Sequence, residues 1–279
     1  KDKISWAVET QPYETWQHIH ARYTPETFEE YWEEWGNKQN DAVGEVLYLI
    51  AECEVDGLTV AENDDERSLV QLIINYLNRI EYWHDADSGI WEENQEVRAS
   101  SIGAVVRALK TAQQLPYVTI PEGMIEKGEQ ALRALLPRET ETRFCDLALL
   151  TLIFPFDVTT KEETETILRN AEYFLLRDRG VIRYRNDRYY NNNKDGYSEE
   201  AEWSMGVAWL TIIYARLGNF EKASYYFKEA DKTINKEGLI PELWYSHTDK
   251  QNDNTPLGWA ESMYVVALVL MRDLYLKEK

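Results

Sequence analysis

The sequence predicts an all-α fold in which helices pack as pairs. Apolar residues recur at helical spacing over long segments, as in residues 66–83, where Leu69 and Leu72 lie on one face. The connections between these segments are either short or long, and the long ones are rich in aromatic and acidic residues. No credible set of β strands accompanies them. A toroid of helix pairs, or another α-solenoid, is the packing that such a series favours.

The first half of the chain is expected to contain helices separated by polar, aromatic loops. Residues 24–30 are typical of a short capped helix with Pro at its first position. Residues 32–41 form a loop that ends on a helix N-cap and leads into a strongly apolar helix over 42–53. Further helices are predicted over 66–83 and 101–113.

The second half continues the helical pattern with two interruptions. Residues 180–190 alternate aromatic and basic side chains, which suits a short hairpin or an extended loop. Residues 238–245 form another long loop. Glu199, Glu200 and Glu202 are interpreted as negative charges at the N-terminus of a helix, although Glu202 could face a pocket. The predicted helices of this half span residues 125–136, 144–153, 161–176, 199–217, 220–234 and 258–276.

The chain is expected to form one domain over residues 1–279. It is long enough to bury a sizeable core, and no Pro-, Gly- or Ser-rich linker divides it. Its two cysteines, Cys53 and Cys145, are too few and too far apart for a disulfide framework. The sequence shows neither a signal segment nor an apolar run of spanning length. We therefore expect a reducing, cytoplasmic location.

Charge and aromatic content restrict the class of partner. With 50 acidic and 30 basic residues, the chain has a formal net charge of −20, which repels phosphate backbones and anionic membrane surfaces. Neither nucleic acid nor a membrane is expected as a partner. The 10 Trp and 18 Tyr greatly outnumber the 7 Phe. Rings with an apolar face and a polar edge suit surfaces that stack on sugars, and they also suit a helical core.

Residues 89–101 combine neighbouring carboxylates with a tryptophan, directly after a glycine and before a helix-like apolar run. An indole beside a carboxyl group excludes water and disfavours the charged form, which raises the pKa of a glutamate toward the range of a proton donor. Trp91, Glu92 and Glu93 are therefore candidates for acid catalysis. The alternative is a solvated acidic loop that caps the helix starting near Val97.

No pattern in the sequence predicts a metal or a cofactor. His18 and His20 would share a face only in an extended strand, and the surrounding sequence lacks a strand pattern and a third ligand. His84 and His247 are isolated. The chain also contains no nucleotide-binding loop and no Ser/His/Asp arrangement.

Four motifs occur in a fixed order along the chain, namely WGNKQND at residues 35–41, GIWEE at 89–93, IRY at 182–184 and PEL at 241–243. Together they resemble glycoside hydrolase family 15, the glucoamylases and glucodextranases. The chain is also similar to the helical domain of the phosphorylase kinase α and β regulatory subunits. This second resemblance extends through residues 98–103 and 135–138.

The resemblance implies an (α/α)6 barrel with a sugar site. By motif position, Trp35, Asn40 and Asp41 line that site. Glu92 falls at the general acid and Glu242 at the general base. These roles imply a glycosidase whose partner is a carbohydrate, an α-glucan or an oligosaccharide, and which uses no cofactor.

Four further residues are assigned to substrate binding. Arg183 falls where the family has a substrate-binding arginine, and Trp91 and Trp244 lie beside the candidate catalytic glutamates in the sequence. Glu93 is the rival of Glu92 for the acid role. It is placed second because the family motif has the acid directly after the tryptophan, and its alternative role is a hydrogen bond to a sugar hydroxyl or to the helix start.

Inverting hydrolysis needs one carboxyl group at the leaving oxygen and another that holds water on the opposite face of the sugar, roughly 6.5–9.5 Å away. Glu92 and Glu242 suit these roles because each lies in a loop beside aromatic residues, and neither has an adjacent Lys or Arg in the sequence. They are predicted to face each other across a cavity. The long loops at 32–41, 84–96, 180–197 and 238–256 are predicted to converge on one end.

The chain also departs from the family. No arginine–aspartate pair that would hold the terminal glucose occurs before Trp35, so the barrel is expected to be truncated at its first helices. This departure favours a second hypothesis, a non-catalytic glucan-binding or regulatory module like that of the phosphorylase kinase regulatory subunits. Retention of both Glu92 and Glu242 favours the hydrolase.

Overall fold

The computed structural model describes residues 1–31, 38–191 and 199–277, and it divides the chain into two compact units. Each unit has its own buried core, and we describe the two in turn. The single domain over residues 1–279 stays a prediction.

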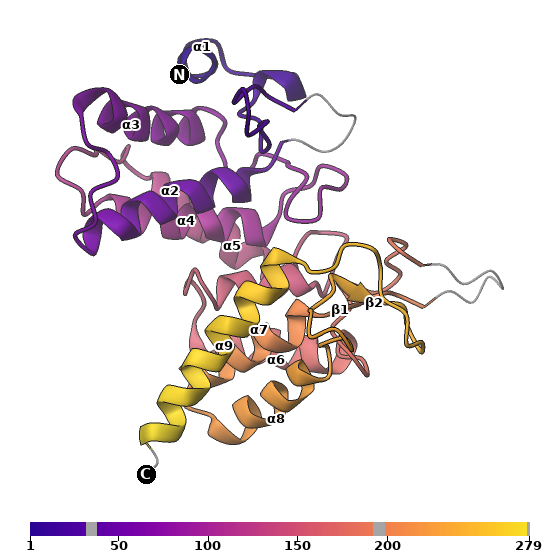
Figure 1. The fold of residues 1–279 in the computed structure, drawn as a ribbon. Helices are drawn as coiled ribbons and strands as arrows, with labels where there is room; N and C mark the ends of the chain where they lie inside the picture. Colours follow the sequence, from indigo (N-terminus) through magenta and orange to yellow (C-terminus); the bar gives the residue numbers. More distant parts are fainter. Residues whose placement is uncertain (32–37, 192–198, 278–279) are drawn as a thin grey trace. The chain divides into compact units, whose positions relative to one another are not determined.

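The first unit comprises Lys1–Phe144 and Pro155–Thr159 and is built from helices (Figure 1). Its elements are α1 (Asp2–Thr10), a 3-10 helix (Thr15–Gln17), α2 (Asn40–Val55), α3 (Asp64–Arg79), α4 (Ala99–Ala112) and α5 (Met124–Leu135). In α4 only Arg107 and Lys110 are not buried. This helix is therefore the centre of the first core.

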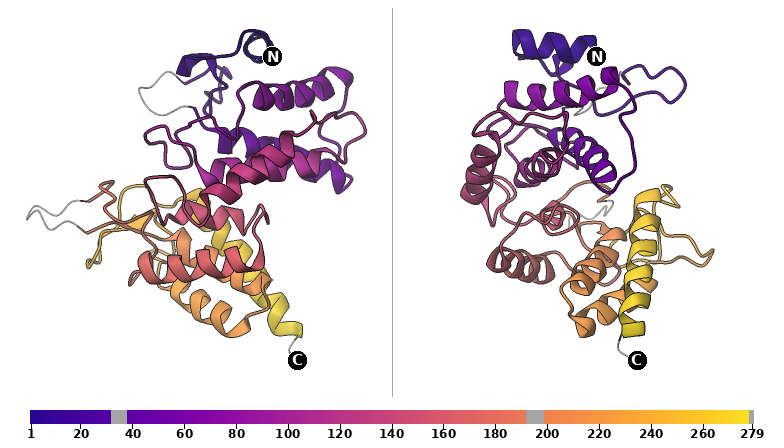
Figure 2. Two further views of the ribbon diagram at one scale, coloured as in Figure 1. Left: turned by 180° about the vertical axis from the view of Figure 1, so that it is seen from behind. Right: turned by 90° about the vertical axis from the view of Figure 1, so that its left-hand side faces the viewer.

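A glycine allows α2 to approach α4 closely. A Cβ atom at Gly44 would lie 2.9 Å from the backbone nitrogen of Val105 and 3.1 Å from the Cβ of Ala104. The two helices lie side by side, as Figure 2 shows. Because close packing leaves no room for an added methyl group here, the position of α2, whose first turn holds Asn40 and Asp41, depends on this glycine.

The start of α3 follows from its capping residues. The Asn63 side chain accepts a hydrogen bond from the Glu66 N–H at 3.0 Å, which satisfies one donor of the first turn. Asp64 and Asp65 add negative charge at the same end, and Arg79 adds positive charge at the other end. The cap therefore sets where α3 begins, and the charges at its two ends favour this helix.

The second unit comprises Cys145–Phe154 and Thr160–Lys279. Its elements are a 3-10 helix (Leu147–Leu152), α6 (Lys161–Phe174), β1 (Glu202–Trp203), α7 (Met205–Arg216), α8 (Phe220–Asp231), β2 (Leu243–Trp244) and α9 (Gly258–Lys277). The helix α7 is buried along nearly its whole length, with α8 and α9 packed against it (Figure 1). It is the centre of the second core.

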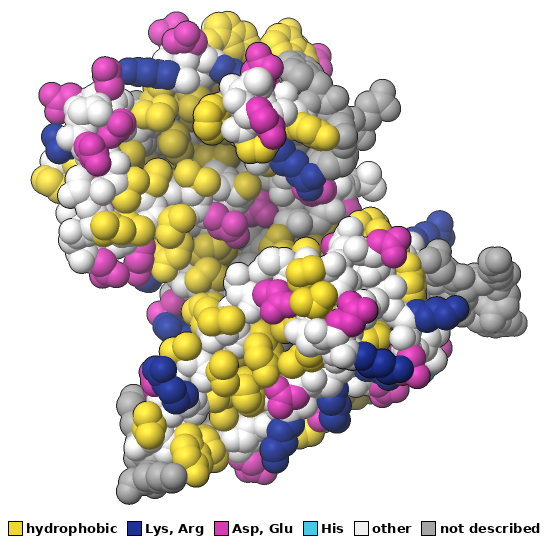
Figure 3. Space-filling view, in the orientation of Figure 1, with side chains coloured by type: hydrophobic (Ala, Val, Ile, Leu, Met, Phe, Trp, Pro, Cys, Tyr) yellow, Lys and Arg dark blue, Asp and Glu magenta, His cyan; other side chains and the backbone are white. Residues whose placement is uncertain are grey.

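The last helix is apolar on more than its buried face. Ala260, Met263 and Ala267 of α9 are buried at helical spacing. Val265 and Leu268, on another face, are 54% and 47% exposed. Hydrophobic side chains accordingly gather along α9 in the space-filling view of Figure 3.

The all-helical class is confirmed, but residues 24–30 do not form the predicted short helix. Tyr23 and Glu30 instead form an antiparallel bridge. The Phe28 N–H donates to the Thr24 carbonyl oxygen, and Phe28 then takes a φ of 57°. A left-handed residue at this point prevents continuation of the helix, so the capping pattern produces a turn.

The predicted helix over residues 199–217 begins later than expected, at Met205. Glu202 and Trp203 are extended and pair with Trp244 and Leu243 in a two-stranded antiparallel ladder. Tertiary pairing therefore overrides the helix-start pattern of the acidic run. The predicted absence of strands is wrong to this extent. In the same unit, the helix predicted over 144–153 is reduced to a 3-10 segment.

Among the residues that the structure describes, we find no helix whose length and apolarity would suit a bilayer-spanning segment.

Candidate functional site

In the first unit, the segment before α2 packs on the loop that follows α3. Asp85 connects them, since its carboxylate accepts hydrogen bonds from the Lys38 ammonium group at 2.7 Å and from the Asn40 side chain at 2.9 Å. The Ser88 N–H also donates to the Lys38 carbonyl oxygen at 2.8 Å. The orientation of Asn40 is therefore fixed by Asp85. Trp35, predicted to line the same site, lies outside the described residues.

Asp41 and Asp87 are two carboxylates in the interior of this unit, 4% and 1% exposed. One oxygen of Asp87 accepts hydrogen bonds from the Gly89 N–H at 2.7 Å and from the Ser101 hydroxyl at 2.9 Å. In the described part of the chain, Asp41 Oδ1 and Asp87 Oδ2 have no hydrogen-bond partner. Arg98 is also buried, and its Nε donates to the Asp87 carbonyl oxygen at 3.2 Å.

Both carboxyl groups hold their protons more strongly than an exposed aspartate. Burial raises the pKa of Asp41 to about 6, although the positive charge of Arg98 opposes this shift. Burial also raises the pKa of Asp87 well above its usual range, and the negative charge of Asp41 adds to that effect. The two aspartates therefore influence each other's charge.

Trp91 and Glu92 follow directly in the chain. The Trp91 side chain is buried, at 8% exposed. Glu92 has a φ of 57°, uncommon for a residue with a side chain, and its N–H donates to the Gly89 carbonyl oxygen at 3.0 Å. The Glu92 carboxylate forms an ion pair with the guanidinium of Arg22. The fold thus gives Glu92 a basic partner that its sequence neighbours do not reveal.

Glu93 points to a different arginine. Its carboxylate lies 2.7 Å from the Arg143 guanidinium, and both side chains are partly buried. Adjacent carboxylates that bind separate arginines cannot exchange roles without breaking both ion pairs. The two ion pairs therefore distinguish Glu92 from Glu93. The assignment of Glu92 as the general acid stays a prediction.

In the second unit, Arg183 is buried at 4% exposed and is held by Asp187. Its Nε and Nη2 donate to the two Asp187 oxygens at 2.6 and 2.7 Å, a bidentate arrangement that fixes the guanidinium plane. The guanidinium carbon also lies 4.7 Å from the ring centre of Tyr189 and 5.1 Å from that of Trp203. Arg183 is therefore part of a buried aromatic cluster.

Glu242 lies just before β2 and is 9% exposed. Its Oε2 accepts hydrogen bonds from the side-chain amides of Asn252 at 2.5 Å and Asn254 at 2.8 Å. No donor among the described residues contacts its Oε1. Burial raises the pKa of Tyr189, and the negative charge of Glu242 adds to this shift. Glu242 therefore lies within electrostatic reach of the cluster around Arg183.

Trp244 takes part in a different set of contacts. Its indole N–H donates to the Thr233 carbonyl oxygen at 3.2 Å, and its ring lies 4.7 Å from the Arg179 guanidinium. Glu202, its partner in the ladder, is buried and accepts hydrogen bonds from the Arg179 N–H and the Ser246 hydroxyl. Glu202 therefore does not belong to a helix start, and the alternative that it faces a pocket stays a prediction. A substrate-binding role for Trp244 stays a prediction.

Comparison with known proteins identifies proteins that are similar to this chain. The profile of Glycosyl hydrolases family 15 matches residues 6–117. A probable phosphorylase b kinase regulatory subunit alpha from Caenorhabditis elegans is 26% identical, over 85% of this chain and 23% of the relative. Its counterpart from Drosophila melanogaster is 24% identical, over 97% and 26%. The chain resembles both groups. It spans about a quarter of the length of these two relatives.

Solved structures share the fold. A glycosidase variant in complex with glucose has a TM-score of 0.76 and 17% identity, over 97% of this chain and 76% of its own. The glucoamylase from Saccharomycopsis fibuligera has a TM-score of 0.65 and 14% identity, over 89% and 73%. The predicted glucoamylase-like fold of helix pairs is therefore confirmed.

Sequence patterns missed the residues that hold the candidate side chains. Asp187 follows Arg183 by four positions, but this spacing predicts an ion pair only on a helix, and residues 180–190 were expected to be a hairpin or an extended loop. Asn252 and Asn254 follow Glu242 within one loop, but only the loop conformation shows that both amides reach its carboxylate. No local pattern connects Arg22 to the motif at residues 89–93.

Proposed function

We propose that this chain is an inverting, exo-acting α-glucoside hydrolase that releases β-glucose from α-glucans or oligosaccharides. Glu92 is the general acid in this proposal and Glu242 is the general base. The fold supports it, because a glucoamylase and a glycosidase solved with glucose share that fold. The acidic surface is compatible with a neutral sugar substrate.

The arrangement of Glu242 is the observation that carries the proposal. The amides of Asn252 and Asn254 both bind Oε2, so the carboxylate is held in one orientation. Its Oε1, which accepts no hydrogen bond from the described residues, is available to accept one from a water molecule. A general base needs this combination of a fixed carboxylate and an available oxygen.

The acid half of the reaction depends on Glu92. Its carboxyl group would donate a proton to the leaving oxygen while water, deprotonated by Glu242, attacks the anomeric carbon from the opposite face. Glu92 is partly exposed, and its ion pair with Arg22 must open before it donates a proton. The two carboxyl groups belong to different units, and the separation of about 6.5–9.5 Å that inversion requires stays a prediction.

Sugar binding is assigned to residues around these two groups. The buried, bidentate pair with Asp187 orients Arg183, which suits an arginine that recognises hydroxyl groups at a fixed angle. Asn40 is likewise held, by Asp85, and Asp41 follows it as a buried residue. The substrate-binding residues of the proposal are Trp35, Asn40, Asp41, Trp91, Glu93, Arg183 and Trp244.

Proton NMR of the anomeric product tests the proposal. With maltooligosaccharides or isomaltooligosaccharides, β-glucose is expected first, because attack opposite an α bond inverts the anomeric carbon. Glu92→Gln and Glu242→Gln are each expected to lower the rate by about 10² or more, while sugar binding measured by calorimetry persists. α-Glucose as the first product, or variants as active as the parent, would contradict the assignment.

The ion pair between Arg22 and Glu92 favours a second candidate function, a glucan-binding regulatory module without turnover. A carboxylate engaged by a guanidinium contributes to structure without donating a proton. Two relatives of the chain are regulatory subunits by name. Measurable sugar binding with no glucose released from any α-glucan would favour this module. Because Cys53 and Cys145 are free thiols, we propose a reducing, cytoplasmic location in either case.

A further inference from the structure

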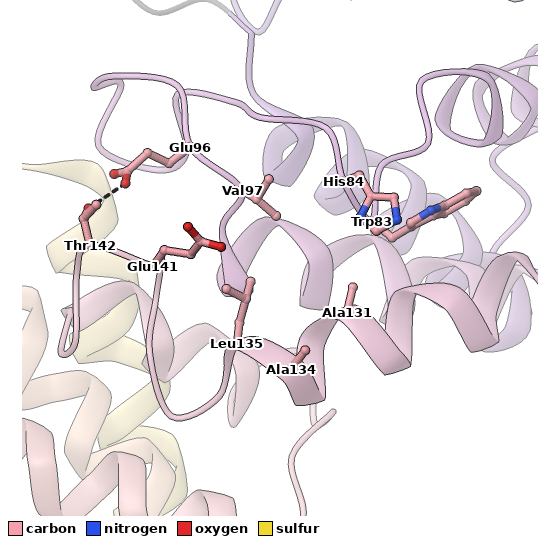
Figure 4. A pocket seen from close by; sticks show the side chains of 9 residues that line it. All are labelled: Trp83, His84, Glu96, Val97, Ala131, Ala134, Leu135, Glu141 and Thr142. Atoms are coloured by element: carbon pink, nitrogen blue, oxygen red, sulfur yellow. Dashed lines mark hydrogen bonds between the residues drawn. The ribbon is translucent and has the colours of Figure 1, made fainter.

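The first unit contains a cavity of about 430 Å³ that neither candidate function uses. It lies between the loop after α3, the segment before α4, the helix α5 and the loop that follows α5 (Figure 4). Its size is at the lower end of the range for ligand pockets in proteins. Its walls differ in character from one end to the other.

One end of the cavity is acidic. The Oε1 atom of Glu96 accepts hydrogen bonds from the hydroxyls of Thr142 at 2.6 Å and Thr140 at 3.1 Å, which fixes that carboxylate. The Glu141 carboxylate points into the cavity (Figure 4). The described residues give the Glu141 carboxylate no hydrogen bond or ion pair, and no Lys or Arg lines the cavity. Arg138 donates to the Thr140 and Glu141 carbonyl oxygens but does not line the cavity, so the two carboxylates face it without a cation in its wall.

The floor of the cavity is aliphatic. Val97, Ala131, Ala134 and Leu135 form it, and the two short alanine side chains project from α5 (Figure 4). Alkyl groups without an exposed ring face suit a hydrocarbon chain and do not suit a stacked sugar. The floor leads away from the two carboxylates.

The opposite end of the cavity, where Trp83 and His84 lie, disfavours a second positive charge. Trp83 closes this end and is only 4% exposed. The ammonium group of Lys127 lies 4.6 Å from the centre of its ring. A polyamine lying along the floor would place a second cation near Lys127, and like charges at short range repel. The cavity therefore suits a ligand that has one positive charge and an apolar stem.

We infer that this cavity binds a single lysine or arginine side chain, with an adjoining apolar residue, from a segment of a partner protein. The methylene stem lies on the alanine floor, and the cationic head lies between Glu96 and Glu141. Anions are disfavoured by the two carboxylates. A neutral ligand would cover Glu141 without offering it a partner, which costs free energy.

An occupant of this cavity contacts the loop that carries the candidate acid. The backbone of Glu96 exchanges both hydrogen bonds with that of Asp87, each at 3.0 Å. Asp87 in turn binds Ser101 and the N–H of Gly89. A partner bound at Glu96 therefore lies against the segment 87–96 that carries Glu92, which is a route for the partner to influence Glu92. The binding inference itself is independent of any hydrolysis.

The inference is tested by NMR titration of the whole chain with a peptide, acetyl-Ala-Leu-Lys-Ala-amide. Saturable shifts are expected for the Trp83 indole N–H and for the methyl groups of Ala131 and Ala134, with a dissociation constant in the millimolar range. The same peptide with norleucine in place of lysine is expected to bind at least fivefold more weakly. Spermidine is expected to bind no more tightly than the lysine peptide.

Variants separate the cavity from non-specific attraction to an acidic protein. Glu141→Gln is expected to weaken binding by up to about fivefold, the effect of an exposed ion pair, and the double variant Glu96→Gln/Glu141→Gln by at least tenfold. Ala134→Leu fills the floor and is expected to abolish the shifts. The control Glu122→Gln removes an exposed carboxylate outside the cavity and is expected to change nothing.

Several outcomes would overturn the inference. If the norleucine peptide bound as tightly as the lysine peptide, the charge of the lysine side chain would play no role. If Glu122→Gln and Glu141→Gln weakened binding equally, the net charge of the protein would explain the effect. Tighter binding of spermidine would assign the cavity to polyamines. If the lysine peptide caused no NMR shifts in the parent chain, the cavity would not be a binding site for it. Far-UV circular dichroism of each variant confirms that it is folded, and Glu141→Gln alters a side chain without hydrogen bonds to other described residues.

Discussion

The guanidinium of Arg22 and the carboxylate of Glu92 form an ion pair between groups 70 residues apart in the sequence. The guanidinium engages the carboxylate that the proposed general acid would present to the leaving oxygen. In the proposed hydrolase Arg22 has to move away from Glu92 before proton transfer, whereas in the proposed binding module the ion pair can stay closed.

Substitution of Arg22 by Gln is expected to raise the rate of glucose release by up to about fivefold. An exposed ion pair contributes up to about 1 kcal/mol, so opening the pair with Arg22 before proton transfer costs that free energy. The cost disappears when Arg22 is replaced. Initial rates on maltotriose measure the effect. The control is Arg67→Gln, which removes an exposed ion pair with Asp64 on α3 and is expected to leave the rate unchanged. A slower Arg22 variant would show that the pair positions Glu92 for catalysis.

The two asparagines beside Glu242 give a second prediction. Asn254→Ala removes one of the two donors to Oε2, so the carboxylate is expected to occupy more orientations. The expected result is a fall in kcat of about tenfold with KM changed less than twofold, because misplacement of a base affects the reaction more than binding. Asn170→Ala, on α6 of the same unit, is the control. Equal effects of the two variants would contradict a positioning role for Asn254.

Helical periodicity was sufficient to predict most of the fold. The segments 42–53, 66–83 and 101–113 correspond to α2, α3 and α4, since each buries an apolar face at a spacing that sequence alone displays. Residues 24–30 have equally good capping signals but bury no such face, with Phe28 79% exposed. Local signals without a buried stripe therefore did not produce a helix, because tertiary packing supplies most of the stability of short helices.

The candidate site was predictable only in part, for a related reason. Motif positions select Glu92, Arg183 and Glu242 as candidates, and their roles stay predictions; all three lie in irregular segments, where binding and catalytic residues are common. The groups that decide their behaviour come from distant segments, as Arg22 does for Glu92 and Arg143 for Glu93. Such pairs depend on how loops close over helices. Sequence spacing does not encode this geometry.

The buried pair of Arg183 and Asp187 gives a prediction for stability. Asp187→Asn is expected to lower the free energy of unfolding by about 3 kcal/mol, because the guanidinium stays buried after its carboxylate is removed. Urea denaturation followed by tryptophan fluorescence measures the change. Asp249→Asn, which breaks the exposed pair with Arg179, is the matched control and is expected to cost less than about 1 kcal/mol. A similar cost for both variants would contradict the role of burial.

The last prediction concerns pH and the buried carboxyl groups of Asp41 and Asp87. Burial raises the pKa of Asp41 from 3.8 to about 6 in the folded chain. Between these values the folded state keeps a proton that the unfolded chain has released, so raising the pH favours unfolding. The contribution of Asp41 to the free energy of unfolding is therefore fully present below about pH 4 and falls as the pH rises to about 6. The raised pKa of Asp87 extends the fall to higher pH.

Asp41→Asn keeps the shape of the side chain and removes its titration, so this part of the pH dependence is expected to disappear. The variant should match the parent near pH 4 and exceed its free energy of unfolding at pH 7 by an amount on the order of 1–3 kcal/mol, as measured by urea denaturation at each pH. Asp56→Asn, an exposed aspartate at the end of α2, controls for the loss of one negative charge. If Asp41→Asn were instead less stable than the parent at pH 7, the carboxylate of Asp41 would be stabilised by its surroundings, and burial would not be the dominant effect on its pKa.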